Sequence, residues 1–318
     1  MSVAREWRQR RGRPLSGPSI SQCTSMPPAW IRTMHSDVGL SSVGLIGVGT
    51  MGGAFARHLV DAGFGVVAHD ADPSRVIEGT TPVASVAEVV GAGVEVVLLS
   101  LPSDDAFAAV VGELKGALLV VDTSTLSLPA KEAGRARLAA VGVTLLDCPV
   151  SGTGAQALAG DLVVYASGPD DALDACAPVL AAFSRAVHRV GPFGAGSKMK
   201  YLANLLVTVH TAAAAEVLAL AERAGVDPAH ALATIRDGAG QSRMLEVRGP
   251  SMATHDYGFG ATVELFVKDM RIIRAFAADA GASTPLLDVA ARLYEEAARA
   301  GWRHEEAAAV HRLYLGEA

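Results

Sequence analysis

Short apolar runs alternate with stretches of helical periodicity between residues 42 and about 191. Residues 95–101 (EVVLLSL) and 118–122 (LLVVD) each contain an unbroken run of four apolar residues and are bounded by turn residues, which is typical of strands buried on both faces of a parallel sheet. Met51, Phe55 and Leu59 recur every four residues, as one buried face of a helix does. Together with similar apolar runs, this alternation predicts a doubly wound α/β layer; those runs lie at residues 43–46, 66–69, 143–146 and 162–166.

The pattern becomes helical in the second half of the chain. Residues 197–222 contain no glycine or proline and are rich in Ala, Leu and Val, which predicts one long helix ending at Gly225. Strand patterns are scarce after residue 191, and further helices are expected at residues 229–237, 265–280 and 285–300. We therefore divide the chain into an extension at 1–37, an α/β domain at 38–196 and an all-helical domain at 197–318, which the long helix joins to the sheet.

The charge is concentrated at the N-terminal end. Residues 1–36 hold six arginines and one acid, a net charge of +5, whereas the whole chain carries −6. Four prolines and no regular period predict a disordered extension there, with Met34 as a second possible start; an Arg-rich transit peptide is the alternative. The acidic remainder argues against a nucleic-acid partner.

Composition narrows the class of protein further. No run of eighteen or more uncharged apolar residues occurs, which predicts that no ordinary helix crosses a membrane. Cys23, Cys148 and Cys176 lie far apart and form neither a zinc spacing nor a disulfide framework. A reducing compartment, the cytoplasm, is the expected location, and no metal site is expected.

The segment GVGTMG at residues 47–52 has the pattern G-x-G-x-x-G between a predicted strand and a predicted helix. Gly47 permits a tight turn, Gly49 lets the backbone approach a pyrophosphate, and Gly52 lets the helix pack closely on the strand. The N–H groups at Thr50 and Met51, in the first helical turn, add a positive dipole end for phosphates. The pattern predicts a Rossmann-type dinucleotide site; a purely structural glycine turn is the alternative.

Asp70 ends the next predicted strand, 18 positions after Gly52, close to where such sites place a carboxylate for the ribose 2′-hydroxyl. A carboxylate there repels a 2′-phosphate, and no arginine follows before Arg75. NAD is therefore the expected cofactor, with NADP possible. Leu101-Pro102 and Thr125 follow two other strands, where the ends of parallel strands line a ligand crevice; ordinary turns are the alternative.

Lysine is rare in this chain, with five lysines against 22 arginines. Lys200 lies in the predicted apolar helix, and burial lowers the pKa of a lysine toward neutrality, where it can transfer protons. Asn204 is four positions further on the same helix face. An ammonium and a carboxamide side by side could hold and protonate a substrate oxygen, although a solvated lysine is the alternative.

A glycine-rich turn follows another predicted strand, at residues 151–154. The backbone N–H groups of Ser151, Gly152 and Thr153 could hold a carboxylate there. A plain loop is the competing interpretation.

Taken together, four segments resemble the β-hydroxyacid dehydrogenase family, which includes 3-hydroxyisobutyrate and 6-phosphogluconate dehydrogenases. The segment beginning GLIGVGTMGG is similar to the cofactor motif, and DCPVSGTGAQALAGDL to the substrate motif. GAGSKMKYLANLL is similar to the catalytic motif, and FVKDM to the C-terminal K-D motif. The likeness covers residues 43–315.

The resemblance implies hydride transfer between NAD(P) and the hydroxyl-bearing carbon of a small hydroxy acid. By position, Lys200 would be the general acid/base, Asn204 would orient the substrate, and residues 151–153 would hold its carboxylate. Thr125 and Lys268 would lie near the nicotinamide, and Leu101-Pro102 beside the adenosine. A homodimer or homotetramer is expected by the same analogy.

Two departures from the family pattern affect the substrate. Thr153 stands where glycine is usual, and Ala203 replaces the first asparagine of a pair, which argues against decarboxylation of 6-phosphogluconate. HTAAAAEVLALAERAG and VELFVKD are similar to the L-threonate dehydrogenase branch, so 3-hydroxyisobutyrate, glycerate, tartronate semialdehyde and threonate all remain candidates. An imine reductase of the same architecture and a non-catalytic dinucleotide-binding protein are the alternatives.

Overall fold

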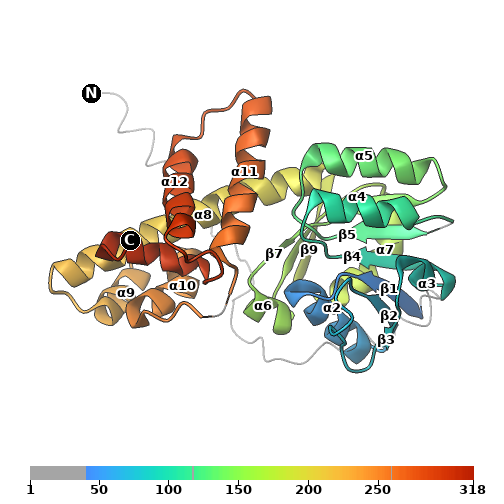
Figure 1. Cartoon of the computed structure of the whole chain (residues 1–318), viewed down its shortest axis with the longest axis horizontal. Coiled ribbons are helices and arrows are strands. Elements are labelled where there is room, and N and C mark those ends of the chain that lie inside the picture. The colour runs from blue at the N-terminus through green and yellow to red at the C-terminus, as the bar shows by residue number, and fades with distance from the viewer. Residues whose placement is uncertain (1–40, 117, 259) are drawn as a thin grey trace, which may run out of the picture.

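The computed structural model describes residues 41–116, 118–258 and 260–318, so the expected extension at 1–37 lies outside the described residues. Figure 1 shows a sheet flanked by helices and a separate group of helices, with the long helix α8 (Ala195–Arg223) running from one to the other. The arrangement places the N-terminal end of α8 against the sheet and its C-terminal part among the other helices.

One sheet holds nine strands in the described part of the chain, in the order β3-β2-β1-β4-β5-β6-β8-β7, with β9 also paired to β8. The pairs from β3 to β6 are parallel, whereas β8 is antiparallel to β6 and β7. The strands are β1 (Ser42–Ile46), β2 (Gly65–His69), β3 (Thr81–Pro82), β4 (Val96–Leu99), β5 (Leu119–Asp122), β6 (Thr144–Asp147), β7 (Val150–Ser151), β8 (Val163–Ser167) and β9 (Ala186–Gly191).

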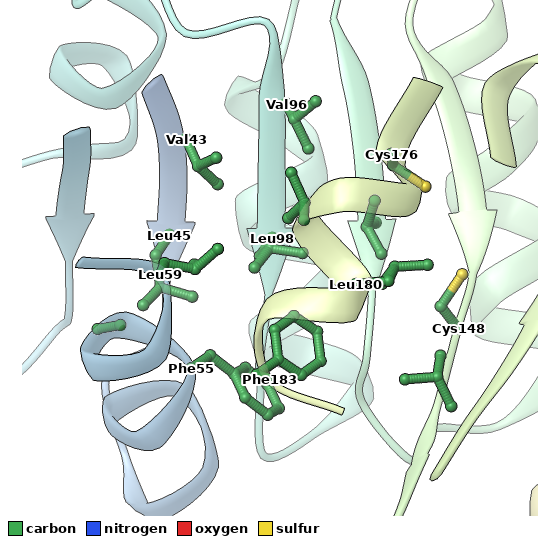
Figure 2. Close-up of a cluster of buried hydrophobic side chains, with 14 of the residues drawn as sticks. Val43, Leu45, Phe55, Leu59, Val96, Leu98, Cys148, Cys176, Leu180 and Phe183 are labelled. Carbon is green, nitrogen blue, oxygen red and sulfur yellow. The ribbon is translucent and has the colours of Figure 1, made fainter. Parts of the chain in front are cut away.

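Both faces of the sheet are covered, because successive strand residues point to opposite faces and both sets are apolar. Leu45 and Leu98 pack with Phe55 and Phe183 on one face, under α2 and α7 (Figure 2). Val97 and Leu99 belong to the core on the other face. The helices of this part are α2 (Thr50–Asp61), α3 (Val86–Gly91), α4 (Asp104–Glu113), α5 (Leu128–Ala139), α6 (Gly154–Leu158) and α7 (Asp170–Ala182).

The second part of the molecule is helical and surrounds the C-terminal half of α8. Tyr201, Leu218, Met270 and Tyr294 are among its buried residues. Its helices after α8 are α9 (Pro228–Arg236), α10 (Arg243–Thr254), α11 (Val263–Asp279), α12 (Pro285–Arg299), the 3-10 helix η2 (Ala307–Val310) and α13 (His311–Leu315).

The fold class predicted from the sequence, a Rossmann-type sheet followed by an all-helical domain, is confirmed. One sequence argument is too strong, however. By length and composition α8 could cross a membrane, and it is the one helix among the described residues that could, with 29 residues and a mean hydropathy of 1.5. In this structure α8 instead packs against the sheet and the helices α10, α11 and α12.

Candidate active site

The glycine turn joins β1 to α2 and leaves space where a phosphate would bind. A Cβ on Gly47, whose φ is +92°, would lie 2.2 Å from the carbonyl oxygen of Ser100, and one on Gly52 would lie 1.9 Å from that of Gly47. At Gly49 a Cβ would meet only an atom of Arg75, 3.6 Å away. Gly49 is the N-cap of α2, and no side chain caps the first N–H groups of that helix. Such N–H groups bind phosphate oxygens, so the turn fits a dinucleotide pyrophosphate.

Asp70 lies directly after β2 and is already held by the glycine turn. Its carboxylate accepts hydrogen bonds from the N–H groups of Val48 (2.6 Å) and Asp72 (2.9 Å). The guanidinium of Arg75 is 3.6 Å from Asp70 and 3.4 Å from the carboxylate of Asp72. In the sequence Arg75 is only the next arginine along the chain, whereas the structure places its guanidinium beside both the Asp70 carboxylate and the turn.

The loops after β4 and β5 are tied to each other. The N–H of Leu101, next to Pro102, donates to the Ser124 hydroxyl at 2.8 Å. The neighbouring residue, Thr125, accepts a hydrogen bond through its carbonyl oxygen from the ammonium of Lys268, also at 2.8 Å. A lysine of α11 thus reaches the end of the sheet, and the two predicted crevice loops lie together.

Lys200 is buried on the second turn of α8, with 8% of its surface exposed. Burial lowers the pKa of Lys200 to about 8, against a partial opposing effect of the Asp269 carboxylate and with a small further decrease from the Lys268 ammonium. An amine with such a pKa exchanges protons readily near neutral pH.

Asp269 connects these groups. It accepts a hydrogen bond from the Asn204 amide at 2.9 Å and forms an ion pair with Lys268 at 3.2 Å. Its buried Oδ1 is the oxygen that faces the Lys268 ammonium, and no described residue donates a well-aligned hydrogen bond to it. The sequence motif indicated Lys268 as the site residue of the K-D pair and assigned no role to Asp269. The structure places Asp269 between Lys268 and Asn204.

The glycine-rich turn after β7 is more constrained than the sequence suggested. Gly152 has φ +149°, and a Cβ there would lie 2.4 Å from a methyl group of Leu162. The Thr153 hydroxyl caps α6, and the Thr153 N–H donates to the Gln156 side chain at 3.0 Å. Because that N–H is already paired, the side of the turn at Ser151 and Gly152 is better suited to a carboxylate.

A cavity of about 380 Å³ lies between the two parts of the molecule. Thr125 and Lys268 line it, together with Ser103 and Asp105 at the start of α4 and Arg271 on α11. The structure thus brings Lys200, Asn204, Lys268 and Thr125 into one connected group by way of Asp269, and the cavity opens beside that group.

Two family models match the chain in succession. Residues 42–191 match the NAD binding domain of 6-phosphogluconate dehydrogenase, and residues 194–314 match the NAD-binding region of NADP-dependent 3-hydroxyisobutyrate dehydrogenase. The junction of the two matches falls just before α8 begins. These matches define an NAD(P)-dependent oxidoreductase with a sheet domain and a helical domain.

Curated relatives and a solved structure agree. The chain is 37% identical to L-threonate dehydrogenase of Cupriavidus necator, over 86% of this chain and 96% of that protein. It is 32% identical to 3-hydroxyisobutyrate dehydrogenase of Pseudomonas aeruginosa, over 87% and 100%. The crystal structure of 3-hydroxyisobutyrate dehydrogenase from Salmonella typhimurium superposes with a TM-score of 0.78 at 31% identity, covering 86% of this chain and 99% of that one. The chain belongs to the β-hydroxyacid dehydrogenase family, as its sequence motifs indicated.

Proposed function

We propose that this NAD(P)-dependent dehydrogenase oxidises L-threonate, with Lys200 as the general acid/base. The observation that carries the proposal is the buried Lys200 amine, whose pKa of about 8 suits proton transfer, beside the Asn204–Asp269–Lys268 cluster. The similarity to an L-threonate dehydrogenase over most of both chains supports the substrate.

In the oxidation direction, neutral Lys200 takes the proton of the substrate hydroxyl as the carbon–hydrogen bond breaks and a carbonyl forms. In the reverse direction, the Lys200 ammonium returns that proton to the developing alkoxide. The bound nicotinamide ring supplies the hydride acceptor or donor. Asn204 orients the reacting oxygen, and Ser151, Gly152 and Thr153 surround the carboxylate, the last through its position rather than its paired N–H.

The binding of NAD rather than NADP is part of the proposal. Gly47, Gly49 and Gly52 with Thr50 and Met51 hold the pyrophosphate, and Asp70 accepts from the ribose. Leu101-Pro102 flanks the adenosine half, and Thr125 and Lys268 flank the nicotinamide. Arg75 neutralises part of the Asp70 charge, so NADP is expected to be used less efficiently rather than refused.

A polyhydroxylated acid fits the site better than an apolar one. Among the described residues, the Asp269 carboxylate faces two donors, the Asn204 amide on one oxygen and the Lys268 ammonium on the other, so it keeps lone pairs that an additional substrate hydroxyl could use. A site built to bind a hydroxyl discriminates strongly against an analogue that lacks it, because its polar groups then stay unpaired.

The test is a panel of acids, each assayed with both cofactors: L-threonate, 3-hydroxyisobutyrate, glycerate and L-serine, with tartronate semialdehyde in the reductive direction. We expect kcat/KM for L-threonate with NAD to exceed every other combination by about tenfold or more. A higher kcat/KM for 3-hydroxyisobutyrate would make that acid, and not L-threonate, the proposed substrate. Reduction of cyclic imines without turnover of any acid would favour an imine reductase. Binding of NADH with no turnover at all would favour a non-catalytic protein.

Two further features complete the proposal. The free thiols of Cys148 and Cys176 are buried, which suits a cytoplasmic location.

A homodimer or homotetramer is supported by a row of exposed apolar residues along α8, namely Met199, Leu202, Leu206, Val217 and Leu220.

A further inference from the structure

Lys131 is a fully buried lysine that the proposed chemistry does not use. It lies on α5 with no exposed surface, and its ammonium is 2.6 Å from the Asp147 carboxylate, 2.9 Å from that of Asp122 and 2.8 Å from the Ser124 carbonyl oxygen. The ammonium donates hydrogen bonds to Asp147 and to the Ser124 carbonyl oxygen, and it forms an ion pair with Asp122. Burial would lower the pKa of Lys131, but the two carboxylates raise it above the ordinary lysine value, and the group stays charged.

One branch of this cluster leads to the cofactor loops. Asp122 ends β5, and its Oδ1 accepts a hydrogen bond from the Ser124 N–H at 3.0 Å. The Ser124 hydroxyl in turn accepts from the N–H of Leu101. Lys131 therefore fixes the loop that carries Thr125 and, through it, the loop that carries Pro102.

The other branch leads to the first turn of α8. Asp147 ends β6, and its carboxylate accepts from the N–H of Ser197 (2.7 Å) and from the Ser197 hydroxyl (2.8 Å). The N–H of Gly196 donates to the Ser167 hydroxyl, which also bonds the Asp147 carbonyl oxygen. A Cβ at Gly196 would lie 2.5 Å from that carbonyl oxygen, so the helix could not approach so closely with any other residue there.

We propose that Lys131 is a positioning residue: its buried ammonium joins the cofactor loops to the first turn of α8 and so fixes Lys200, three residues after Ser197, relative to the nicotinamide side of the cleft. The inference rests on the proposed role of Lys200. A hydride transfer depends on sub-ångström placement, and misplacing a reacting group by about 1 Å can cost about 10²-fold in rate.

The primary test variant is Ser197→Ala, which removes the hydroxyl bond from α8 to Asp147 and keeps the backbone N–H bond and every buried charge. We expect kcat to fall about tenfold with Kd for NADH within about twofold of wild type. The isotope effect with C4-deuterated cofactor should rise, because hydride transfer becomes slower. Ser184→Ala is the matched control, since it removes one hydroxyl bond of similar length, 2.7 Å to the Leu180 carbonyl oxygen, far from the cluster.

Lys131→Met, compared with wild type as folded protein by circular dichroism, should lower kcat about 10²-fold. Wild-type kcat and isotope effect in Ser197→Ala, or an equal loss of kcat in Ser184→Ala, would overturn the proposal.

Nuclear magnetic resonance of ¹³C-labelled lysines separates this proposal from the proposed function, because the chain has only five lysines to assign. In wild type the Lys131 signal should stay that of an ammonium up to about pH 10, while Lys200 titrates near 8. In Ser197→Ala we expect a looser first turn of α8 to expose Lys200 to water, so the pKa of Lys200 should rise. The network is contradicted if Lys131 loses its proton below pH 10, or if the Lys200 pKa is unchanged in Ser197→Ala, whichever substrate the enzyme uses. If both NMR results are as expected but no hydroxy acid is turned over, only the proposed function is contradicted.

Discussion

The environments of individual lysines separate one that can exchange a proton from one that cannot. Lys200 is buried beside a single carboxylate that is shared with Asn204 and Lys268, and burial lowers its pKa to about 8. Lys131 is buried between two carboxylates, and its pKa is raised. The same side chain thus has a pKa suited to proton transfer in one place and stays a fixed charge in the other.

The sign of the pH dependence follows from this lowered pKa. Oxidation of the hydroxy acid needs neutral Lys200, so kcat/KM should rise with pH and level off above about 8. Reduction needs the ammonium, so its kcat/KM should fall as pH rises through the same value. Measurement of kcat/KM in both directions between pH 6 and 10 checks this. If kcat/KM changed in the same direction with pH for oxidation and for reduction, the assignment would be contradicted.

Replacement of Asp269 by asparagine tests what holds the Lys200 pKa. The carboxylate raises that pKa, so Asp269→Asn should move both pH limbs below about 8. It should also lower kcat/KM for L-threonate about tenfold or more, because Asn204 exchanges a charged acceptor for a neutral amide. Asp279→Asn, at the exposed end of the same helix, is the control and should leave the profile unchanged. If the pH limbs of Asp269→Asn stay at their wild-type positions, Asp269 does not set the pKa of Lys200.

Among the elements, the turn from β1 to α2 depends on two adjacent glycines in different ways. Gly52→Ala would place its Cβ 1.9 Å from the Gly47 carbonyl oxygen, which forces the turn open. Gly53→Ala would meet a flexible methyl of Ile77 at 3.3 Å and the Val48 carbonyl oxygen at an ordinary contact distance of 3.6 Å. We expect NADH affinity, measured by fluorescence titration, to fall at least about tenfold in the first variant and little in the second. Equal affinities would mean that the cofactor is not held by this turn.

The sequence predicted those elements whose pattern is set by burial. The central parallel strands are apolar on both faces and were found, whereas β7 has two residues and β9 is mostly exposed, so neither left a pattern. The helix α10 was also missed, because Gly249 and Pro250 interrupt it. Lys200 was found because lysine is rare in an apolar helix, but its partner Asp269 is 69 positions away and becomes visible only when α11 packs on α8.

Lys131 shows the same limit of sequence reasoning. It is as rare a residue as Lys200, and both of its carboxylate partners end predicted strands. A search for lysines near strand-ending aspartates would have singled it out. The sequence alone could not show that α5 buries it between β5 and β6, since that depends on the order of strands in the sheet.

At the scale of the whole molecule, α8 leaves an apolar row uncovered. Leu206 and Leu220 are 53% and 64% exposed, and they share one helix face with the other exposed apolar residues of the row. In the proposed homo-oligomer a second copy of the chain would bury this row, and the face of α8 that carries Lys200 would stay in its own cleft.

We expect Leu220→Glu to convert the assembly to monomers, as measured by light scattering after size exclusion, with the sheet domain still able to bind NADH. Val141→Glu, at an exposed apolar position 46% accessible on the sheet domain, is the control and should not change the mass. If the wild-type protein is already monomeric at micromolar concentration, the row does not form a subunit interface.

The account as a whole depends on proton transfer by Lys200, and its most direct test compares two lysines on one helix. Lys200→Ala should lower kcat for L-threonate by about 10²–10⁴ while Kd for NADH stays within about twofold. Lys198→Ala, two residues earlier and exposed, should match wild type in both. Near wild-type turnover by Lys200→Ala would contradict the central claim.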